Sequence, residues 1–419
     1  MEKINIAAGV DLLFVPNDRF KTERISLNFY LPLEKEKIAE RALLPHILTG
    51  ESAAYPDFSA LNRKIYSLYS ADIDGAAAKM GDLQKINIDC SYLSEAALST
   101  DISGEVLSLL RELVFKPNFS DGVFCPESVE REKRLTCEKI IASFNNKRSY
   151  AISKSVALAF SGEAFGELST GSLEAVQAIT SKSLTDAYYD MLKTAYVLIV
   201  VVAPKLGDGI KTTIADAFSQ IDRKPSRLPE SVPLKAEQTV VSATEQAQVK
   251  QAKYVMMFAG ESPKTDREKA VATVFSDIFG GGTYSLLFSQ VREKMNLCYY
   301  CAARINARKG YLSVDSGVDA QNLEKAHEGI LRQLQKIKSG DFDQSIIDSS
   351  KIAMISALKA SDDSSAALSG FYSNRFDSLI TPEEFAELIG SVTKQDVCEA
   401  AQSFNLSHTF TLTGRDCNE

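Results

Sequence analysis

Histidine is scarce and positive charge is not in excess in this chain of 419 residues. Only three histidines occur, His46, His327 and His408, which limits any metal site or general-base chemistry that depends on imidazole. Lys and Arg total 47 against 55 Asp and Glu, which gives a formal net charge of −8. Because general nucleic-acid binders carry a basic excess or a basic stripe, this composition argues against a polyanion-binding protein.

Long hydrophobic segments are also missing. No uninterrupted apolar run reaches 18 residues, so we expect no membrane-spanning segment. The first residues, MEKINIAAGVDLLFVPND, place charges among the apolar side chains and lack the apolar core of a signal peptide. These two absences predict a cytoplasmic protein.

The cysteines do not form an obvious disulfide framework. Seven cysteines, an odd number scattered along a long chain, predict reduced thiols. Cys298 and Cys301 form a C-x-x-C motif in LCYYCAARI, an aromatic and β-branched stretch that is typical of a strand. Alternation along a strand would point the two sulfur atoms to opposite faces. The motif also lacks the turn and helix of a redox pair, so the sequence favours a structural role for both cysteines.

The overall composition is that of a globular protein, with 45% apolar and 24% charged residues. At roughly 150 residues per domain, the length predicts two or three domains. A chain of this length buries enough surface to fold without a metal or a disulfide.

The two halves of the chain repeat one order of elements. SLEAVQAITSKSLTDAYYDMLKTAYVLIVVVAP predicts two helices followed by a strand, and TPEEFAELIGSVTKQDVCEAAQSFNLSHTFTLTG at the end of the chain predicts the same series. Within these segments Ile179-Thr180 matches Val392-Thr393, and the strand over 197–202 matches the strand over 409–413. Duplication of one unit of about 200 residues explains the repeat, at a size usual for a domain.

A proline-rich segment separates the halves. IDRKPSRLPESVPLKAEQ contains three prolines that can continue neither a helix nor a central strand. We therefore predict an α+β fold with two homologous domains, over residues 1–221 and 238–419, joined by a linker over 222–237.

Four segments in this order resemble the insulinase/pitrilysin family of peptidases, in its short, two-domain, processing-peptidase-like branch. They extend over nearly the whole chain and read ALLPHILTGESAAYP, VEREKRLTCEKI, FSGEAFGELSTGSLEAVQAIT and FGGGTYSLLFSQVREKMNLCYY. The resemblance implies that each domain is a mainly antiparallel sheet packed with helices. It also implies that the chain forms half of a clamshell.

Active members of this family share an H-x-x-E-H signature on a helix. Its two histidines bind zinc, its glutamate acts as general base on the zinc-bound water, and a distal glutamate completes the protein ligands. By this resemblance, the four positions correspond here to Ala42, Pro45, His46 and Glu130. Ala42 has no lone pair for a metal, and Pro45 can neither accept a proton nor donate a backbone N–H. One imidazole and one carboxylate are too few for a catalytic zinc, so we expect neither a metal nor a catalytic residue in this chain.

The three histidines and Glu130 can also be explained without a metal site. His327 and His408 lie in the second half, and we do not expect either to complete a zinc site. His46 lies on an apolar helix, where a partly buried, hydrogen-bonded histidine is common. Glu130 is predicted at the edge of an inward stripe, either as a remnant of a former site or as an acid that stabilises the helix dipole. The predicted stripe consists of Val129, Cys137, Ile140, Ile141 and Phe144.

The second half keeps a segment that the resemblance connects with substrate binding. Arg292 and Tyr299 match the positions at which family members contact a peptide or the site of the catalytic half, where both could hydrogen bond a peptide carbonyl. The alternative is a surface arginine paired with Glu293 or Asp277 and a tyrosine packed in the core. Before this segment, three glycines either cap a helix or let a peptide backbone approach closely. They are Gly280, Gly281 and Gly282.

These features lead to three hypotheses for the function. The first is a non-catalytic insulinase-like subunit that pairs with an active H-x-x-E-H homologue and binds an extended peptide, with zinc only in the partner. The second is an active zinc metallopeptidase with a rearranged site. The third is a peptide-binding or scaffold homodimer without a protease partner.

Overall fold

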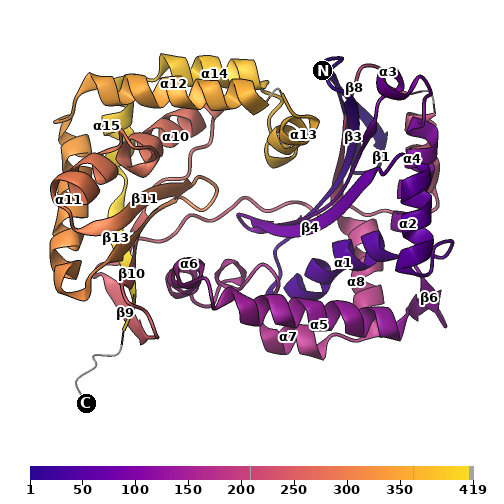
Figure 1. Cartoon of the computed structure of the whole chain (residues 1–419), viewed down its shortest axis with the longest axis horizontal. Helices are drawn as coiled ribbons and strands as arrows, with labels where there is room; N and C mark the ends of the chain where they lie inside the picture. Colours follow the sequence, from indigo (N-terminus) through magenta and orange to yellow (C-terminus); the bar gives the residue numbers. More distant parts are fainter. Residues whose placement is uncertain (208, 362, 415–419) are drawn as a thin grey trace. The chain divides into compact units, whose positions relative to one another are not determined.

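The computed structural model describes residues 1–207, 209–361 and 363–414. Within these residues, none of the helices combines the length and the hydrophobicity that a bilayer crossing demands. The chain folds into two compact units (Figure 1). The first unit comprises 1–140, 167–230 and 360–379, and the second comprises 141–166, 231–359 and 380–419.

The first unit is built on a six-stranded sheet in the order β1-β2-β8-β3-β5-β4. The strands are antiparallel to their neighbours except for β2 and β8, which run parallel. Alternating residues of β3 and β5 point into the main core, which helices α1, α4 and α8 complete on one face. The strands are β1 (Glu2–Ala7), β2 (Val10–Pro16), β3 (Thr22–Pro32), β4 (Asp72–Met80), β5 (Leu83–Leu93) and β8 (Tyr196–Ala203).

Helices and a short hairpin surround this sheet. The long helix α5 begins at Pro126, which suits the first turn because its missing N–H would be unpaired there. The elements are α1 (Ile38–Gly50), α2 (Phe58–Ser67), α3 (Glu95–Leu98), α4 (Ser103–Phe115), β6 (Phe119–Ser120), β7 (Val123–Phe124), α5 (Pro126–Ser143), α7 (Leu173–Ala178), α8 (Ser181–Thr194) and α9 (Ile210–Ser219).

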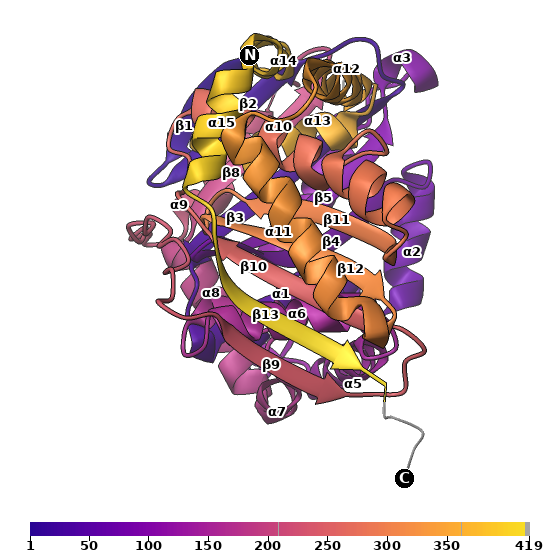
Figure 2. The ribbon, with the colours of Figure 1, turned by 90° about the vertical axis from the view of Figure 1, so that its left-hand side faces the viewer.

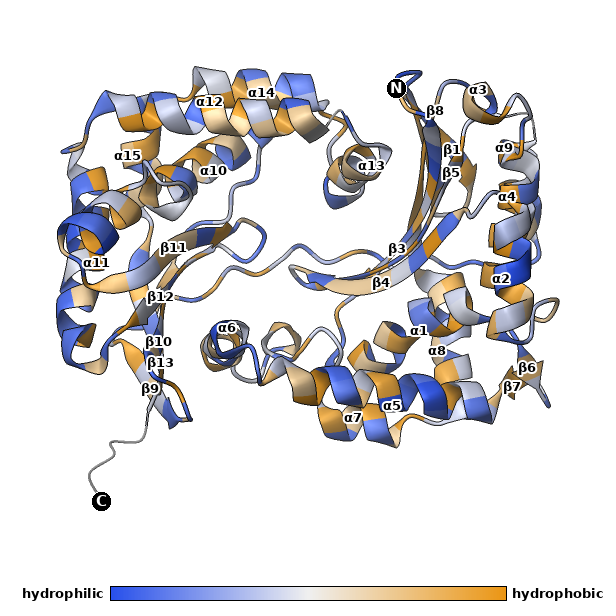
Figure 3. Cartoon of the chain, in the orientation of Figure 1, coloured by the Kyte–Doolittle hydropathy of each residue, from blue (hydrophilic) through white to orange (hydrophobic). Residues whose placement is uncertain are grey.

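The second unit contains a five-stranded sheet in the order β11-β12-β10-β13-β9. Helix α11 lies across its strands in Figure 2, and α15 packs on α10 and α11. Helix α11 buries residues at spacings of three and four, from Ala326 to Ile337, and carries hydrophilic residues on its other side (Figure 3). The elements are β9 (Val241–Gln246), β10 (Ala252–Ala259), α10 (Asp266–Gly280), the π-helix η3 (Leu287–Lys294), β11 (Cys298–Asn306), β12 (Tyr311–Val318), α11 (Leu323–Ser339), α12 (Gln344–Ser361), α14 (Pro382–Ser391), α15 (Lys394–Gln402) and β13 (Asn405–Thr413).

The α+β fold class predicted from the sequence is confirmed, and the repeated local signals fold alike. Thr180 and Thr393 both act as N-caps with a complete capping box, at the starts of α8 and α15. The strand that follows each helix, β8 or β13, runs parallel to one neighbour and antiparallel to the other. The matching dipeptides in the sequence therefore mark the same helix start in each unit.

Each unit also takes a helix from the other half of the sequence. Helix α6 (Lys147–Ala159) packs on β10 and β13 of the second unit, where Tyr150 donates a 2.7 Å hydrogen bond to Glu245. Helix α13 (Ser365–Asn374) packs on β3 and β8 of the first unit, where Tyr30 donates to the Ser373 carbonyl at 2.5 Å. The units therefore differ in these two segments from the predicted ranges 1–221 and 238–419, because each helix finds its packing surface on a distant sheet.

Candidate functional site

Helix α1 carries three of the four positions that correspond to a zinc site, and two of them are packed into the core. Ala42 is 5% exposed and Pro45 is buried. Strand β4 approaches Pro45 so closely that a Cβ atom added to Gly75 would lie 2.8 Å from the Pro45 carbonyl oxygen. Glycine at position 75 permits this approach. Pro45 therefore serves the packing of α1 on β4, and Ala42 is buried in the core.

Pro45 also affects the backbone of α1. Proline inside a helix removes one backbone hydrogen bond and crowds the preceding turn, at a cost of about 3 kcal/mol. The helix nevertheless continues to Gly50, and the Thr49 hydroxyl donates to the Pro45 carbonyl at 2.8 Å. This hydrogen bond gives the Pro45 carbonyl a partner, and the pyrrolidine ring itself has no atom that could accept a proton as a general base.

His46 is half-buried on the same helix, in surroundings that favour its neutral form. Burial lowers its pKa below the ordinary 6.5, and the positive charge of Lys139 lowers it further. Glu132 and Asp74 oppose this shift. The charges that act on His46 thus come from α5 and β4. One of them, Lys139, is a cation and would repel a metal ion.

Glu130 points away from this environment. Its side chain is 68% exposed and forms an ion pair with Lys133 at 2.7 Å. The predicted place at the edge of an inward stripe is therefore wrong for Glu130. The residues of α5 that act on His46 are Glu132 and Lys139, seven positions apart and hence on one helix face. That spacing was present in the sequence, but the family pattern pointed to Glu130.

The predicted inward stripe of α5 is also correct only in part. Val129 is buried, and Cys137 and Ile140 pack against the core of the first unit. In contrast, Ile141 is 63% exposed and Phe144 is 41% exposed. The part of α5 that belongs to the first unit ends at residue 140, so the last turn of the helix extends beyond the core that the stripe covers.

These residues do not fit a catalytic zinc. Two of the four matching positions carry a methyl group and a pyrrolidine ring, the charge of Lys139 disfavours a cation at the single imidazole, and the matching carboxylate is exposed. Across the part of the chain that the structure describes, no group of three or more His, Cys, Asp or Glu side chains could hold a metal ion. We therefore derive no reaction step through a metal in this chain.

The other two histidines belong to the second unit. Nδ1 of His327 lies 2.6 Å from the Tyr254 hydroxyl, and His408 is 4% exposed on β13. Burial lowers the pKa of both, as it does for His46. All three imidazoles are therefore stabilised in the neutral form.

This shared shift predicts how stability depends on pH. A folded-state pKa below the unfolded value of 6.5 means that the unfolded chain binds more protons, so the free energy of unfolding falls as pH drops below about 6.5. Urea titrations at pH 7.5, 6.5 and 5.5 should show this decline. The His46→Gln variant should show a shallower decline than the natural chain, whatever its stability at pH 7.5. An unchanged slope in the variant would contradict the assignment.

The three glycines at the end of α10 have separate local roles. A Cβ atom on Gly280 would lie 2.4 Å from the backbone nitrogen of Ala303 in β11, so this glycine lets the helix touch the sheet. The backbone N–H of Gly281 donates to Asp277 and caps α10. None of the three has a positive φ, so a left-handed turn does not explain them. At position 280, the close packing of α10 on β11 is sufficient to explain the glycine.

Arg292 lies on η3 and is partly exposed. Its side chain is 38% exposed, its guanidinium lies 4.3 Å from the centre of the Phe288 ring, and its Nε lies 3.7 Å from a Glu293 oxygen. Asp277, the other predicted partner, instead accepts hydrogen bonds from Tyr284 and Ser350, both at 2.6 Å. The exposed part of the guanidinium can therefore still donate to another molecule.

Tyr299 is 66% exposed on β11, so the alternative of a tyrosine packed in the core does not apply to it. It lies at an irregularity in the pairing of β11 with β12, where Cys298 opposes Val318 but Tyr300 opposes Gly317. This bulge turns Tyr299 outward and leaves Tyr300 to pack, with the Arg148 guanidinium 4.2 Å from its ring centre. His46 belongs to the first unit, whereas Arg292 and Tyr299 belong to the second.

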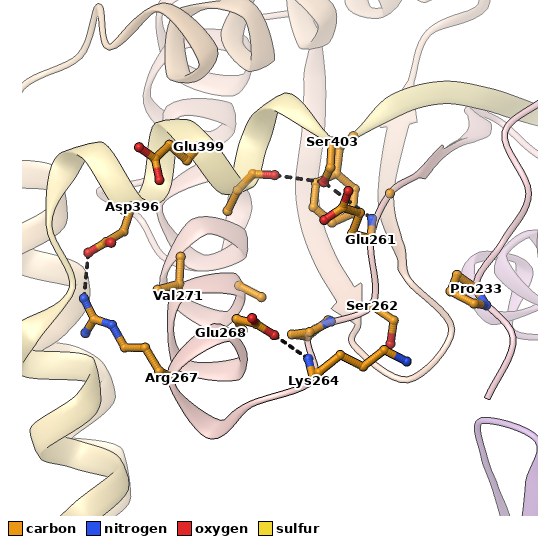
Figure 4. Close-up of a pocket in the computed structure, with 15 residues that line it drawn as sticks. Pro233, Glu261, Ser262, Lys264, Arg267, Glu268, Val271, Asp396, Glu399 and Ser403 are labelled. Carbon is orange, nitrogen blue, oxygen red and sulfur yellow. Dashed lines mark hydrogen bonds and ion pairs between the residues drawn. The ribbon is translucent and has the colours of Figure 1, made fainter. Parts of the chain in front are cut away.

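A cavity of about 720 Å³ in the second unit contains none of the predicted site residues. It lies between the loop after β10, the start of α10 and α15 (Figure 4). Its charged groups are engaged in local structure: Arg267 pairs with Asp396 at 2.7 Å, and the Glu268 carboxylate accepts the Lys264 backbone N–H at 2.6 Å. These contacts fix helix ends, so they give the cavity no separate chemical role.

Comparisons with known proteins agree with this degenerate site. Residues 178–354 match the model of the peptidase M16 inactive domain. The chain is 27% identical to the "probable inactive metalloprotease YmfF" of Bacillus subtilis (strain 168), over 97% of this chain and 96% of that protein. The chain is therefore similar to inactive, insulinase-like proteins of the M16 peptidase family.

Two solved structures share the fold along the whole chain. A conserved protein from Enterococcus faecalis V583 has a TM-score of 0.89 at 24% identity, over 100% of this chain and 99% of that one. A peptidase M16 inactive domain from Pseudomonas fluorescens has a TM-score of 0.79 at 17% identity, with the same coverage of 100% and 99%. The fold predicted from the resemblance is thus confirmed.

Proposed function

We propose that this chain is the non-catalytic subunit of a two-component peptidase. It pairs with an active, zinc-bearing H-x-x-E-H homologue, binds an extended peptide and contributes Arg292 and Tyr299 to that peptide. The observation that carries the proposal is the site on α1, where a buried methyl group and a buried pyrrolidine ring replace a zinc ligand and the general base.

The second unit supports the binding part of the proposal. The side chains of Arg292 and Tyr299 are both accessible, and neither is buried in the core of the second unit. A guanidinium and a phenol can each donate to a peptide carbonyl, and such bonds strengthen when negative charge develops on that oxygen. A subunit that retains these donors without a metal can assist hydrolysis only when a partner supplies the activated water.

The proposal is tested by metal analysis and a reconstitution assay. The purified chain should bind no stoichiometric zinc and cleave no peptide from an unstructured peptide mixture. Addition of the H-x-x-E-H homologue from the same organism should give chelator-sensitive cleavage above that of the homologue alone. Within the pair, Arg292→Ala should lower kcat/KM by about 100-fold and Tyr299→Phe by about tenfold.

A matched variant controls for the loss of a surface charge. Arg332 is an exposed arginine on α11 of the same unit, and Arg332→Ala should leave the activity of the pair unchanged. One equivalent of zinc together with activity that His46→Ala abolishes would instead support a peptidase with a rearranged site. Isolation from the native host as a homodimer, without an H-x-x-E-H homologue, would support a scaffold.

A further inference from the structure

The bulge in β11 brings the two cysteines of the C-x-x-C motif to one face of the sheet. Cys298 opposes Val318 and Cys301 opposes Ser316, two residues apart on β12. Residues two apart on a strand share a face, so their partners on β11 share one too. The sequence-based prediction of opposite faces is therefore wrong, because regular alternation does not account for the extra residue Tyr299.

This shared face is the one that the helices cover. Ala303, two residues beyond Cys301, contacts Gly280 of α10, so both thiols lie under α10 and η3. Cys298 is 8% exposed and Cys301 is 6% exposed. The two thiols are close enough for each to affect the pKa of the other.

The spacing of the two residues suits a covalent bond. Their partners on β12, Val318 and Ser316, are two positions apart, and such Cα atoms are separated by roughly 6.5 Å, which the bulge makes the expected span of the two cysteines as well. Disulfides join residues whose Cα atoms are up to about 6.8 Å apart. A disulfide here requires rotation of the two side chains and little movement of the backbone.

The surroundings make the two thiols chemically unequal. The hydrogen bond from Cys301 lowers the pKa of Cys298, and the nearby Arg292 guanidinium lowers it further, against the effect of burial. The pKa of Cys301 is raised by its bond to Cys298 and by burial. Cys298 is also the first residue of β11, and we expect its thiol to be the one that reacts first.

We propose that Cys298 and Cys301 form a reversible disulfide at this bulge, by exchange with a small-molecule disulfide. The Cys298 thiolate attacks one sulfur of the reagent, forms a mixed disulfide and releases one thiolate. Cys301 then loses its proton, attacks the Cys298 sulfur and displaces the second thiolate. The two cysteines are oxidised by two electrons, and the reagent is reduced to two thiols.

The modification can be tested on the natural full-length chain with oxidised glutathione as the probe. Trypsin cleaves after Lys294 and Arg304, so both cysteines lie on the single peptide MNLCYYCAAR. After acid quenching and alkylation in denaturant, this peptide should lack two hydrogen atoms and carry no alkyl group. Treatment with dithiothreitol before alkylation should restore two alkylated cysteines. In mixtures of reduced and oxidised glutathione, the folded chain should oxidise under conditions about tenfold more reducing than the urea-unfolded chain.

Single-cysteine variants separate this disulfide from simple glutathionylation. In Cys298→Ser and in Cys301→Ser, the remaining cysteine should be either alkylated or glutathionylated. Cys90, whose pKa burial raises to about 12, should stay fully alkylated throughout. Two alkylated cysteines in the oxidised natural chain, a stable glutathione adduct on Cys298, or equal oxidation of folded and unfolded chain would each overturn the proposal. The test is independent of any partner subunit and of peptide cleavage.

Discussion

Replacing Arg41 with alanine should destabilise the first unit by about 3 kcal/mol. The Arg41 side chain is 1% exposed, and its guanidinium lies 2.9 Å from Glu34 and 3.1 Å from Asp190. It also donates to the Pro32 carbonyl at 2.8 Å. The substitution leaves a cavity beside α1. It also removes the guanidinium through which α1 is bonded to β3 and α8. For a unit of this size, the thermal midpoint should fall by about 6–12 °C.

Lys37 provides the matched control for this experiment. Its ammonium group pairs with the same two carboxylates, at 3.1 Å from Glu34 and 3.4 Å from Asp190, but its side chain is 42% exposed. Lys37→Ala should therefore change the stability by no more than about 0.5 kcal/mol. Similar losses in the two variants would show that charge alone, and not burial, determines the contribution of Arg41.

Replacing Gly280 with alanine should destabilise the second unit by about 2–3 kcal/mol. The added methyl group would lie 2.4 Å from the Ala303 backbone nitrogen and 2.7 Å from the Ala303 Cβ atom, neither of which can rotate away. Helix α10 would have to move off β11 to relieve the contact. Chemical denaturation followed by circular dichroism measures the effect.

Two other glycines control for the intrinsic effect of the substitution. Gly370 lies within α13 and has no atom within 4 Å of an added Cβ, so Gly370→Ala should stabilise the chain by about 0.5–1 kcal/mol. An added Cβ on Gly282 meets only the Tyr284 side chain, so Gly282→Ala should cost less than Gly280→Ala. A stabilising Gly280→Ala would contradict the close packing of α10 on β11.

The degenerate site and the fold are connected through α1. Ala42 and Pro45 are core residues of this helix, and Gly75 is suited to the proline next to it. Restoring a histidine and a glutamate at these positions would place polar groups in an apolar contact with β4.

Several features followed from the sequence alone. Hydrophobic periodicity predicted the two helices and the strand that recur in each half, and the matched threonines, Thr180 and Thr393, cap the second helix of each pair in the structure. The order of segments predicted the α+β fold and the family. The identity of residues 42 and 45 also led to the expectation that no standard zinc site is present, since a methyl group cannot bind a metal and a proline ring cannot act as a base in any fold.

Other features depended on contacts between distant parts of the chain. The packing of α6 and α13 on the sheet of the opposite half, and the outward direction of Glu130, are set by which surfaces remain to be covered. The bulge at Tyr299 is a mismatch between β11 and β12, so neither strand shows it alone. Local periodicity determined whether each segment became a helix or a strand. Strand pairing and burial decided which side chains face one another, because contacts between distant segments contribute free energy only once the chain has folded.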